Sequence, residues 1–152
     1  MNKLYENFYS TKTNLASSPI YIKANMKWKQ NATTVAGENE RGEKLNQFDH
    51  PHGIFINHHQ QSIYVADWGN HRIVTWKLAK NNKESIPVNF DAYGSKIYQL
   101  YGSVIVIVDE NSKFLIISDI QNERIVRWSL ENQQDKQIVI PNVKCYGLIV
   151  CF

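Results

Sequence analysis

A repeated segment limits the folds open to this chain. Residues 63–78 read IYVADWGNHRIVTWKL and residues 115–130 read LIISDIQNERIVRWSL; aligned without gaps, seven of the sixteen positions are identical at an offset of 52 residues. The same offset pairs the apolar runs at 54–57 and 106–109. A repeat of this kind indicates equivalent supersecondary units that stack, because one unit alone cannot bury its apolar faces.

Each unit is predicted to hold four short strands. β-branched and aromatic runs bounded by Asn, Asp, Gly, Ser and Lys favour strands, and no window shows a helical period. Four strands in a repeat of about forty residues are typical of a β-propeller blade, so the predicted fold class is all-β, a partial β-propeller of four-stranded antiparallel blades. The strands are expected at 53–57, 62–67, 72–77 and 86–90, and at 104–109, 114–119, 124–129 and 137–140.

The turn between the second and third strands carries the same polar residues in both units. Aspartate accepts backbone N–H groups in an Asx-type turn, asparagine tolerates a positive φ, and arginine can return to the carboxylate. We therefore predict a structural turn motif that fastens each hairpin, since a catalytic acid would be wanted once and not twice. The residues are Asp67, Asn70 and Arg72 in the first unit and Asp119, Asn122 and Arg124 in the second.

A tryptophan closes the third strand of each unit. Trp76 and Trp128 are identical at the repeat offset. A large ring at this position can fill the space between adjacent blades while its N–H finds a partner at the edge. We expect both residues to serve packing.

These residues resemble the NHL-repeat family of β-propellers. The resemblance is carried by Pro51-His52-Gly53-Ile54 at the opening of a blade, Ile63-Tyr64-Val65-Ala66-Asp67 in its second strand and Asn70-His71-Arg72-Ile73 after it. In the second unit Glu123 stands in place of the histidine, and Leu100-Tyr101-Gly102 stands in place of the usual opening. The resemblance implies the propeller fold.

The resemblance covers residues 26–152 as an incomplete propeller. Blade repeats fall at about 51–90 and 103–140, and a third blade is cut off at residue 152. Residues 1–25 carry none of it, and we expect them to be a poorly ordered N-terminal leader. An open propeller exposes sheet edges that can pair with another chain, so self-association is also expected. We favour a fragment of a longer protein; closure of several copies into a ring, or completion by another protein, stays open.

The charge pattern argues against two classes of partner. Residues 1–29 hold five Lys and one Glu, whereas residues 49–152 balance ten basic against ten acidic residues. Nucleic-acid binding needs a folded basic surface that releases counterions, so we expect RNA binding to be weak and a nucleic-acid partner to be disfavoured. The longest uncharged apolar run, Val104–Val108, is five residues, far below the roughly 20 of a membrane-spanning helix. No signal peptide is visible, and the compartment stays unassigned; an extracellular location stays open if a leader is missing.

Four of the five histidines fall within ten residues and raise a metal hypothesis. The resemblance draws attention to His52, because amidating lyases of NHL type hold zinc with histidines from Pro-His-Gly-like openings. One such opening is present, and a catalytic zinc needs about three protein ligands. We therefore predict no metal and no cofactor, with His52 as a weak candidate. A zinc-dependent peptidylamidoglycolate-lyase-like propeller is the enzymatic alternative.

We expect a non-catalytic binding or scaffold module whose partner is a protein. The predicted contacts are His58 and His59 in the turn after the first strand, and Trp68 and Ile120, which are apolar at turn positions that usually carry polar residues. Trp68 could equally cover the neighbouring blade. The resemblance implies one more alternative, an RNA-binding propeller of the tripartite-motif ubiquitin-ligase type.

Overall fold

The computed structural model describes residues 34, 36–37, 40–78, 83–88 and 93–148. The chain divides into two compact units, Met1–Ala36 and Gly37–Phe152, and every described strand lies in the second. The predicted leader at 1–25 lies outside the described residues, as does the end of the predicted third blade at 149–152. None of the helices in the described part is long and apolar enough to cross a membrane.

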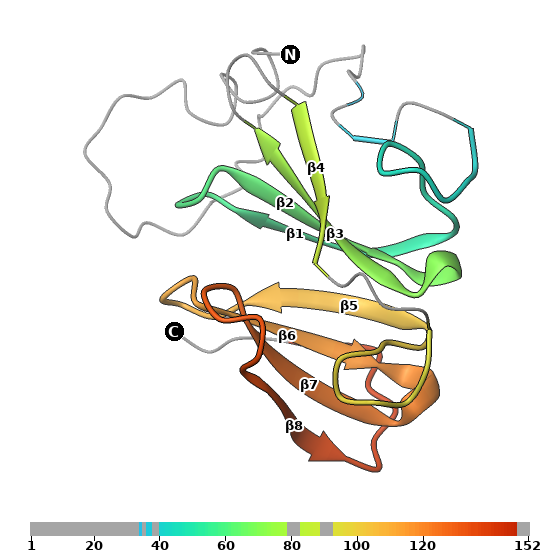
Figure 1. Cartoon of the computed structure of the whole chain (residues 1–152), viewed down its shortest axis with the longest axis vertical. Helices are drawn as coiled ribbons and strands as arrows, with labels where there is room; N and C mark the ends of the chain where they lie inside the picture. Colours follow the sequence, from blue (N-terminus) through green and yellow to red (C-terminus); the bar gives the residue numbers. More distant parts are fainter. Residues whose placement is uncertain (1–33, 35, 38–39, 79–82, 89–92, 149–152) are drawn as a thin grey trace, which may run out of the picture. The chain divides into compact units, whose positions relative to one another are not determined.

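The described strands form two four-stranded antiparallel sheets, which confirms the predicted all-β fold class (Figure 1). Each sheet follows chain order, so each is a meander of the kind found in propeller blades. The first sheet contains β1 (Pro51–Asn57), β2 (Ser62–Asp67), β3 (Arg72–Leu78) and β4 (Lys83–Pro87), and the second contains β5 (Ser103–Val108), β6 (Phe114–Asp119), β7 (Arg124–Ser129) and β8 (Lys136–Pro141). Short 3-10 turns, η1 (Trp68–Asn70) and η2 (Ile120–Asn122), join β2 to β3 and β6 to β7.

The strand at 86–90 is the one predicted strand that is clearly displaced. β4 begins at Lys83, which pairs with Leu78 of β3, and it ends at Pro87. The prediction followed the apolar run at 86–90. An edge strand is defined instead by its backbone pairing with the neighbouring strand, and here this pairing begins before the apolar run. Residues 89–90 lie outside the described residues.

The two sheets are irregular at the same place. Pairing of β1 with β2 shifts register between Pro51 and Ile54, and pairing of β5 with β6 shifts between Ser103 and Ile105. A Cβ atom added to Gly53 at the first shift would lie 2.5 Å from the carbonyl oxygen of Val104. The first strands of the two sheets therefore approach closely, and glycine makes this approach sterically free.

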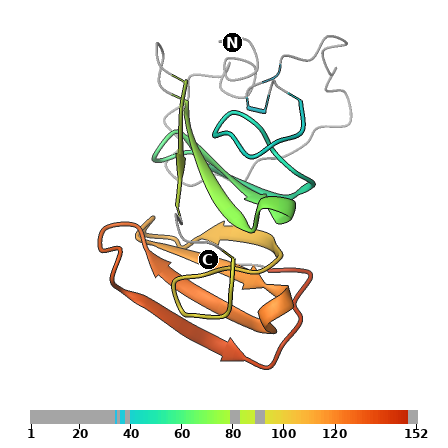
Figure 2. The ribbon, with the colours of Figure 1, turned by 45° about the vertical axis from the view of Figure 1, so that its right-hand side comes forward.

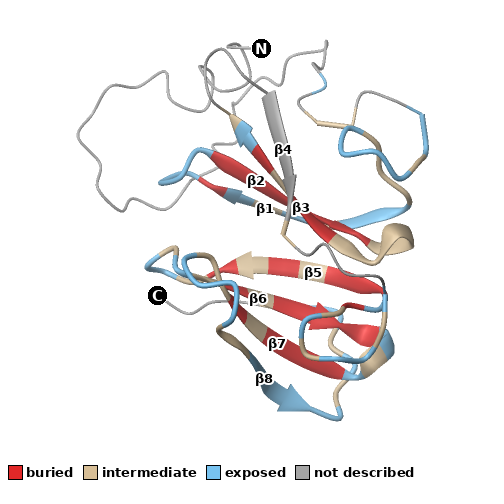
Figure 3. Ribbon diagram, viewed as in Figure 1, coloured by how far each residue is buried: buried red, intermediate tan, exposed pale blue. Residues whose placement is uncertain are grey.

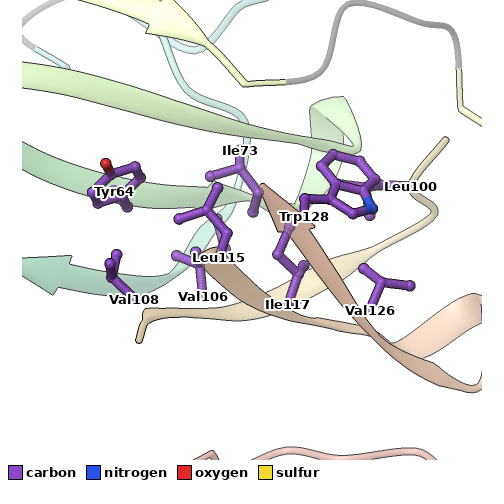
Figure 4. Packing of buried hydrophobic residues seen from close by; sticks show 10 residues of the cluster. Tyr64, Ile73, Leu100, Val106, Val108, Leu115, Ile117, Val126 and Trp128 are labelled. Carbon is purple, nitrogen blue, oxygen red and sulfur yellow. The ribbon is translucent and has the colours of Figure 1, made fainter. Parts of the chain in front are cut away.

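The two sheets share one hydrophobic core (Figure 4). In β3, Ile73 faces this core. The equivalent residue of β7, Ile125, does not belong to the core, and Val126 and Trp128 of that strand face it instead. The sheets therefore use opposite faces, as units stacked in one direction must. Figure 3 shows buried residues along β2, β3 and β5–β7 and an exposed β8. The core residues are Tyr64, Ala66, Ile73, Leu100, Val106, Val108, Leu115, Ile117, Val126 and Trp128.

The tryptophans of β3 and β7 are both buried. Trp128 lies between the sheets with 1% of its surface exposed, and Trp76 is 5% exposed. Within the described residues neither indole N–H has a hydrogen-bond partner, so the prediction of an edge partner is wrong. Burial of the large ring dominates at both positions.

Candidate functional site

One buried aspartate fastens the turn between β2 and β3. Asp67 is fully buried, and its Oδ2 accepts hydrogen bonds from Asn70 Nδ2 at 2.8 Å and Arg72 Nε at 2.7 Å. Its Oδ1 accepts the backbone N–H of Asp49 at 2.7 Å. The aspartate thus connects the turn to the segment before β1. The prediction that Asp67 accepts a backbone N–H within its own Asx-type turn is wrong, because the N–H that it accepts comes from Asp49.

The left-handed residue of this turn also differs from the prediction. The positive φ of 54° belongs to His71, and not to Asn70. The N–H of His71 closes the turn on the carbonyl of Trp68 at 3.2 Å. Asn70 contributes its side chain, whose Nδ2 donates to Asp67.

The second sheet repeats the arrangement. Asp119 is fully buried and accepts the backbone N–H of Tyr101 at 2.7 Å, Asn122 Nδ2 at 2.8 Å and Arg124 Nε at 2.8 Å. Glu123 takes the positive φ of 50°. The two sets have the same bonds at the same offset, which is what a structural role requires.

Each arginine also holds a loop that precedes its blade. Arg72 donates to the carbonyls of Glu43, Lys44 and Gln47 at 2.6–2.9 Å, and Arg124 donates to those of Ser95, Lys96 and Gln99 at 2.7–2.8 Å. The sequence analysis missed these loops, because it followed apolar runs. A signal was present: Gly42, Lys44 and Gln47 recur as Gly94, Lys96 and Gln99 at the repeat offset.

Aromatic and histidine rings gather at the end of the sheets that carries η1. His52 and Trp68 have ring centroids 5.8 Å apart, and His50 stands edge-on to Trp68 at 6.2 Å. A second group joins His71 to Tyr101 at 5.1 Å and to Tyr93 at 5.3 Å, and the two tyrosines lie 5.8 Å apart. Tyr93 is 66% exposed and Tyr101 is 40% exposed. We call these six residues the ring surface: His50, His52, Trp68, His71, Tyr93 and Tyr101.

Gly102 connects the two groups of rings. Its N–H donates to His71 Nδ1 at 3.1 Å, and a Cβ atom added to it would lie 3.0 Å from Trp68 Nε1. Its φ of +65° also favours glycine. The ring surface therefore runs from the first sheet onto the segment that opens the second, and Trp68 both covers this segment and remains half-buried.

The two exposed tyrosines stand at positions that carry an ion pair in the other blade. At the repeat offset Arg41 and Asp49 correspond to Tyr93 and Tyr101. Arg41 binds Asp49 with Nε at 2.7 Å from Oδ1 and Nη2 at 3.1 Å from Oδ2, and His50 Nδ1 contacts the same carboxylate. The hydrogen bond from Arg41 holds the pKa of Asp49 below its ordinary value. Equivalent backbone positions of the two blades therefore carry the Arg41–Asp49 ion pair in one blade and the exposed rings of Tyr93 and Tyr101 in the other.

The other predicted contact residues lie elsewhere. His58 and His59 are exposed in the hairpin between β1 and β2, at the opposite end of the sheet from η1 (Figure 2). Ile120 is 5% exposed, so the prediction of an exposed contact there is wrong: it caps the end of the second sheet. His52 is exposed, and within the described ranges no three His, Cys, Asp or Glu side chains come together as a metal-binding group.

Comparison with known proteins identifies the first blade. Residues 48–76 match the family model of the NHL repeat, which includes the whole turn motif from Asp67 to Arg72. No curated protein matches the chain. Among solved structures, the chain resembles a protein from Bacteroides uniformis ATCC 8492 provisionally named a 6-phosphogluconolactonase, with 16% identity and a TM-score of 0.43. The match covers 69% of this chain and 30% of that one, so this chain spans less than a third of its length. The match of residues 48–76 to the NHL repeat is consistent with the NHL-repeat family that the sequence resembles.

Proposed function

We propose that this chain is a non-catalytic binding module built of NHL-type blades, that its partner is a protein, and that the ring surface receives this partner. The observation that carries the proposal is the pair of exposed tyrosines, Tyr93 and Tyr101, at positions where the other blade uses an ion pair. Exposed aromatic rings lower solubility, and a binding role would account for them at positions where the other blade carries charged residues.

The ring surface has the chemistry of a protein interface. Tyrosine and tryptophan are enriched where interfaces concentrate their binding energy, because they bring large, rigid contact areas at a small entropic cost. Arg41, next to this surface, is already bound to Asp49. A guanidinium that is already paired with a carboxylate offers less attraction to a phosphate backbone, which favours a protein partner over RNA.

A site-specific crosslinking experiment tests the proposal. A photoreactive phenylalanine analogue replaces Tyr93, and a matched chain carries it at His59, which is exposed at the other end of the first sheet. We expect a crosslinked protein from the 93 position that is absent from the 59 position. The captured protein, once purified, should bind the unmodified chain at least tenfold more tightly than a Tyr93→Ala variant. Equal capture at both positions, or equal binding by both chains, would contradict the proposal.

A further inference from the structure

We infer that copies of this chain stack head to tail, so that the first sheet of one copy lies on the second sheet of the next. This contact repeats the one that the two sheets make with each other inside the chain. Two open apolar surfaces carry the inference, one on β1 and one on β5 and β6. Neither surface includes a residue of the ring surface, so the inference goes beyond the proposed function and does not rest on it.

The contact inside the chain shows which faces two neighbouring blades bring together. Strand β5 lies against β1 and β2. From β5, Val106 and Val108 enter the shared core and are 1% and 2% exposed. From the first sheet, Tyr64 enters the same core and Phe55 packs against it. Because side chains alternate along a strand, the two sheets use opposite faces of equivalent strands.

The first sheet carries an open equivalent of the face that β5 buries. At the repeat offset Val106 and Val108 correspond to Ile54 and Ile56 of β1. These isoleucines are 66% and 45% exposed. The same face of β2 and β3 is already buried, so the open part is confined to β1. We call Ile54 and Ile56 the β1 surface.

The second sheet carries the matching face. At the repeat offset Ile107 and Ile116 correspond to Phe55 and Tyr64, which the internal contact covers. Ile107 and Ile116 are register partners on β5 and β6, and both are partly exposed, whereas Tyr64 is buried. Ile105, on the same face of β5, is also partly exposed. We call Ile105, Ile107 and Ile116 the β5–β6 surface.

Both halves of the internal contact are therefore present and open on one chain, and this selects a second copy as the occupant. Repeat units of this kind bury their faces against their neighbours. Two different surfaces that fit each other join copies head to tail, as a heterologous contact. Both surfaces consist of isoleucine, so burial of apolar area drives the association.

One substitution makes this contact looser than the internal one. Gly53 lets β1 approach the backbone of Val104 inside the chain, and the residue at the repeat offset from Gly53 is Ile105. The isoleucine side chain holds a second copy further away, so less apolar area is buried. We therefore expect a reversible association that depends on protein concentration.

Sedimentation velocity of the full chain at rising concentrations tests the inference. We expect the wild-type mass to rise with concentration above that of one chain. Ile54→Lys places a charge in the β1 surface and Ile107→Lys places one in the β5–β6 surface, so each variant alone should remain a single chain. Each variant keeps the surface that the other has lost, so an equimolar mixture should form a pair of chains and grow no further.

The experiment has a matched control and a check on folding. Leu45→Lys, at a side chain that is 42% exposed and outside both surfaces, should associate like the wild type. Circular dichroism shows whether each variant is folded. If Ile107→Lys does not fold, Ile107→Thr takes its place, because it keeps a β-branched residue in the strand, and it should weaken association at least fivefold.

Three results would overturn the inference: a wild-type chain that stays single at its highest soluble concentration, a folded lysine variant of either surface that associates like the wild type, or a mixture that stays as single chains. The proposed function is tested separately. A protein partner captured through position 93 by a chain that never self-associates would refute the stacking and retain the protein interface.

Discussion

At the scale of single residues, the buried aspartates hold this fold together. Asp119 receives three hydrogen bonds in a site with no solvent contact, and Arg124 is 7% exposed at the side chain. Breaking such a buried ion pair is costly because one charge remains buried after its partner is removed. Without this carboxylate, Arg124 would be a buried charge whose remaining partners are neutral backbone carbonyls.

We predict that Asp119→Asn lowers the free energy of unfolding by about 3–5 kcal/mol, because it keeps the shape and leaves Arg124 unpaired. The matched control is Asp135→Asn, which breaks a pair with Arg127 at 3.8 Å in which both side chains are about one third exposed. That control should cost less than about 1 kcal/mol. Urea unfolding followed by tryptophan fluorescence measures both. Equal losses would show that Asp119 has no special weight.

The ion pair at Asp49 gives a prediction for pH. The hydrogen bond from Arg41 lowers the pKa of Asp49 from its ordinary 3.8, so the charged form favours the folded state. The stabilisation is present above about pH 3.8 and is lost as the pH falls through the lowered pKa. In Arg41→Gln the pKa of Asp49 should rise toward its ordinary value, as measured by carboxyl carbon shifts. An unchanged pKa would mean that Arg41 is not the cause.

The sequence predicted the contacts of these residues only where the two partners lie close together along the chain. The return of Arg72 to Asp67 follows from their pairing across a hairpin, and the sequence analysis expected it. The second oxygen of Asp67 bonds Asp49, 18 residues earlier, which no local rule predicts. Tyr101 was noted only within the departure from the usual blade opening at 100–102, and Tyr93 belongs to none of the strand or turn patterns that the sequence analysis followed.

At the scale of elements, the close approach of β1 and β5 sets the spacing of the sheets. Strands β2, β3, β6 and β7 were predicted within one residue, because apolar runs and turn residues mark both of their ends. The direction in which the sheets stack was not predictable, since both faces of each sheet are apolar. Gly53 contacts the backbone of Val104 and so reports this stacking.

We predict that Gly53→Ala destabilises the fold by about 1–3 kcal/mol, because the added methyl group meets backbone that cannot step aside. Gly53 has no positive φ, so the change tests space alone. Gly147→Ala is the control: nothing lies within 4 Å of the added atom, and the change should stay within about 0.5 kcal/mol. Thermal unfolding measures the loss of stability in both variants. A Gly53→Ala variant as stable as the control would contradict the described contact of β1 with β5.

At the scale of the whole molecule, one core serves both sheets. Leu100 is fully buried in the segment before β5, and its core neighbours include Ile73 of the first sheet and Trp128 of the second. Because these side chains form one cluster, the sheets should unfold together.

We predict that Leu100→Ala costs about 2–5 kcal/mol, the usual loss for a large core truncation. Hydrogen exchange should then show reduced protection in β2 and β6 alike. Leu45→Ala, at a side chain that is 42% exposed, is the control and should change little. Loss of protection confined to one sheet would show that the blades fold separately.

The central claim is that the ring surface is built for binding on a frame that does not need it. The most direct test is the double variant Tyr93→Ala/Tyr101→Ala, measured for thermal stability and for affinity toward the partner captured through position 93. We predict a stability change of no more than about 1 kcal/mol, as for exposed side chains, together with a loss of affinity of at least tenfold. Unfolding of the variant, or binding equal to the wild type, would contradict the claim.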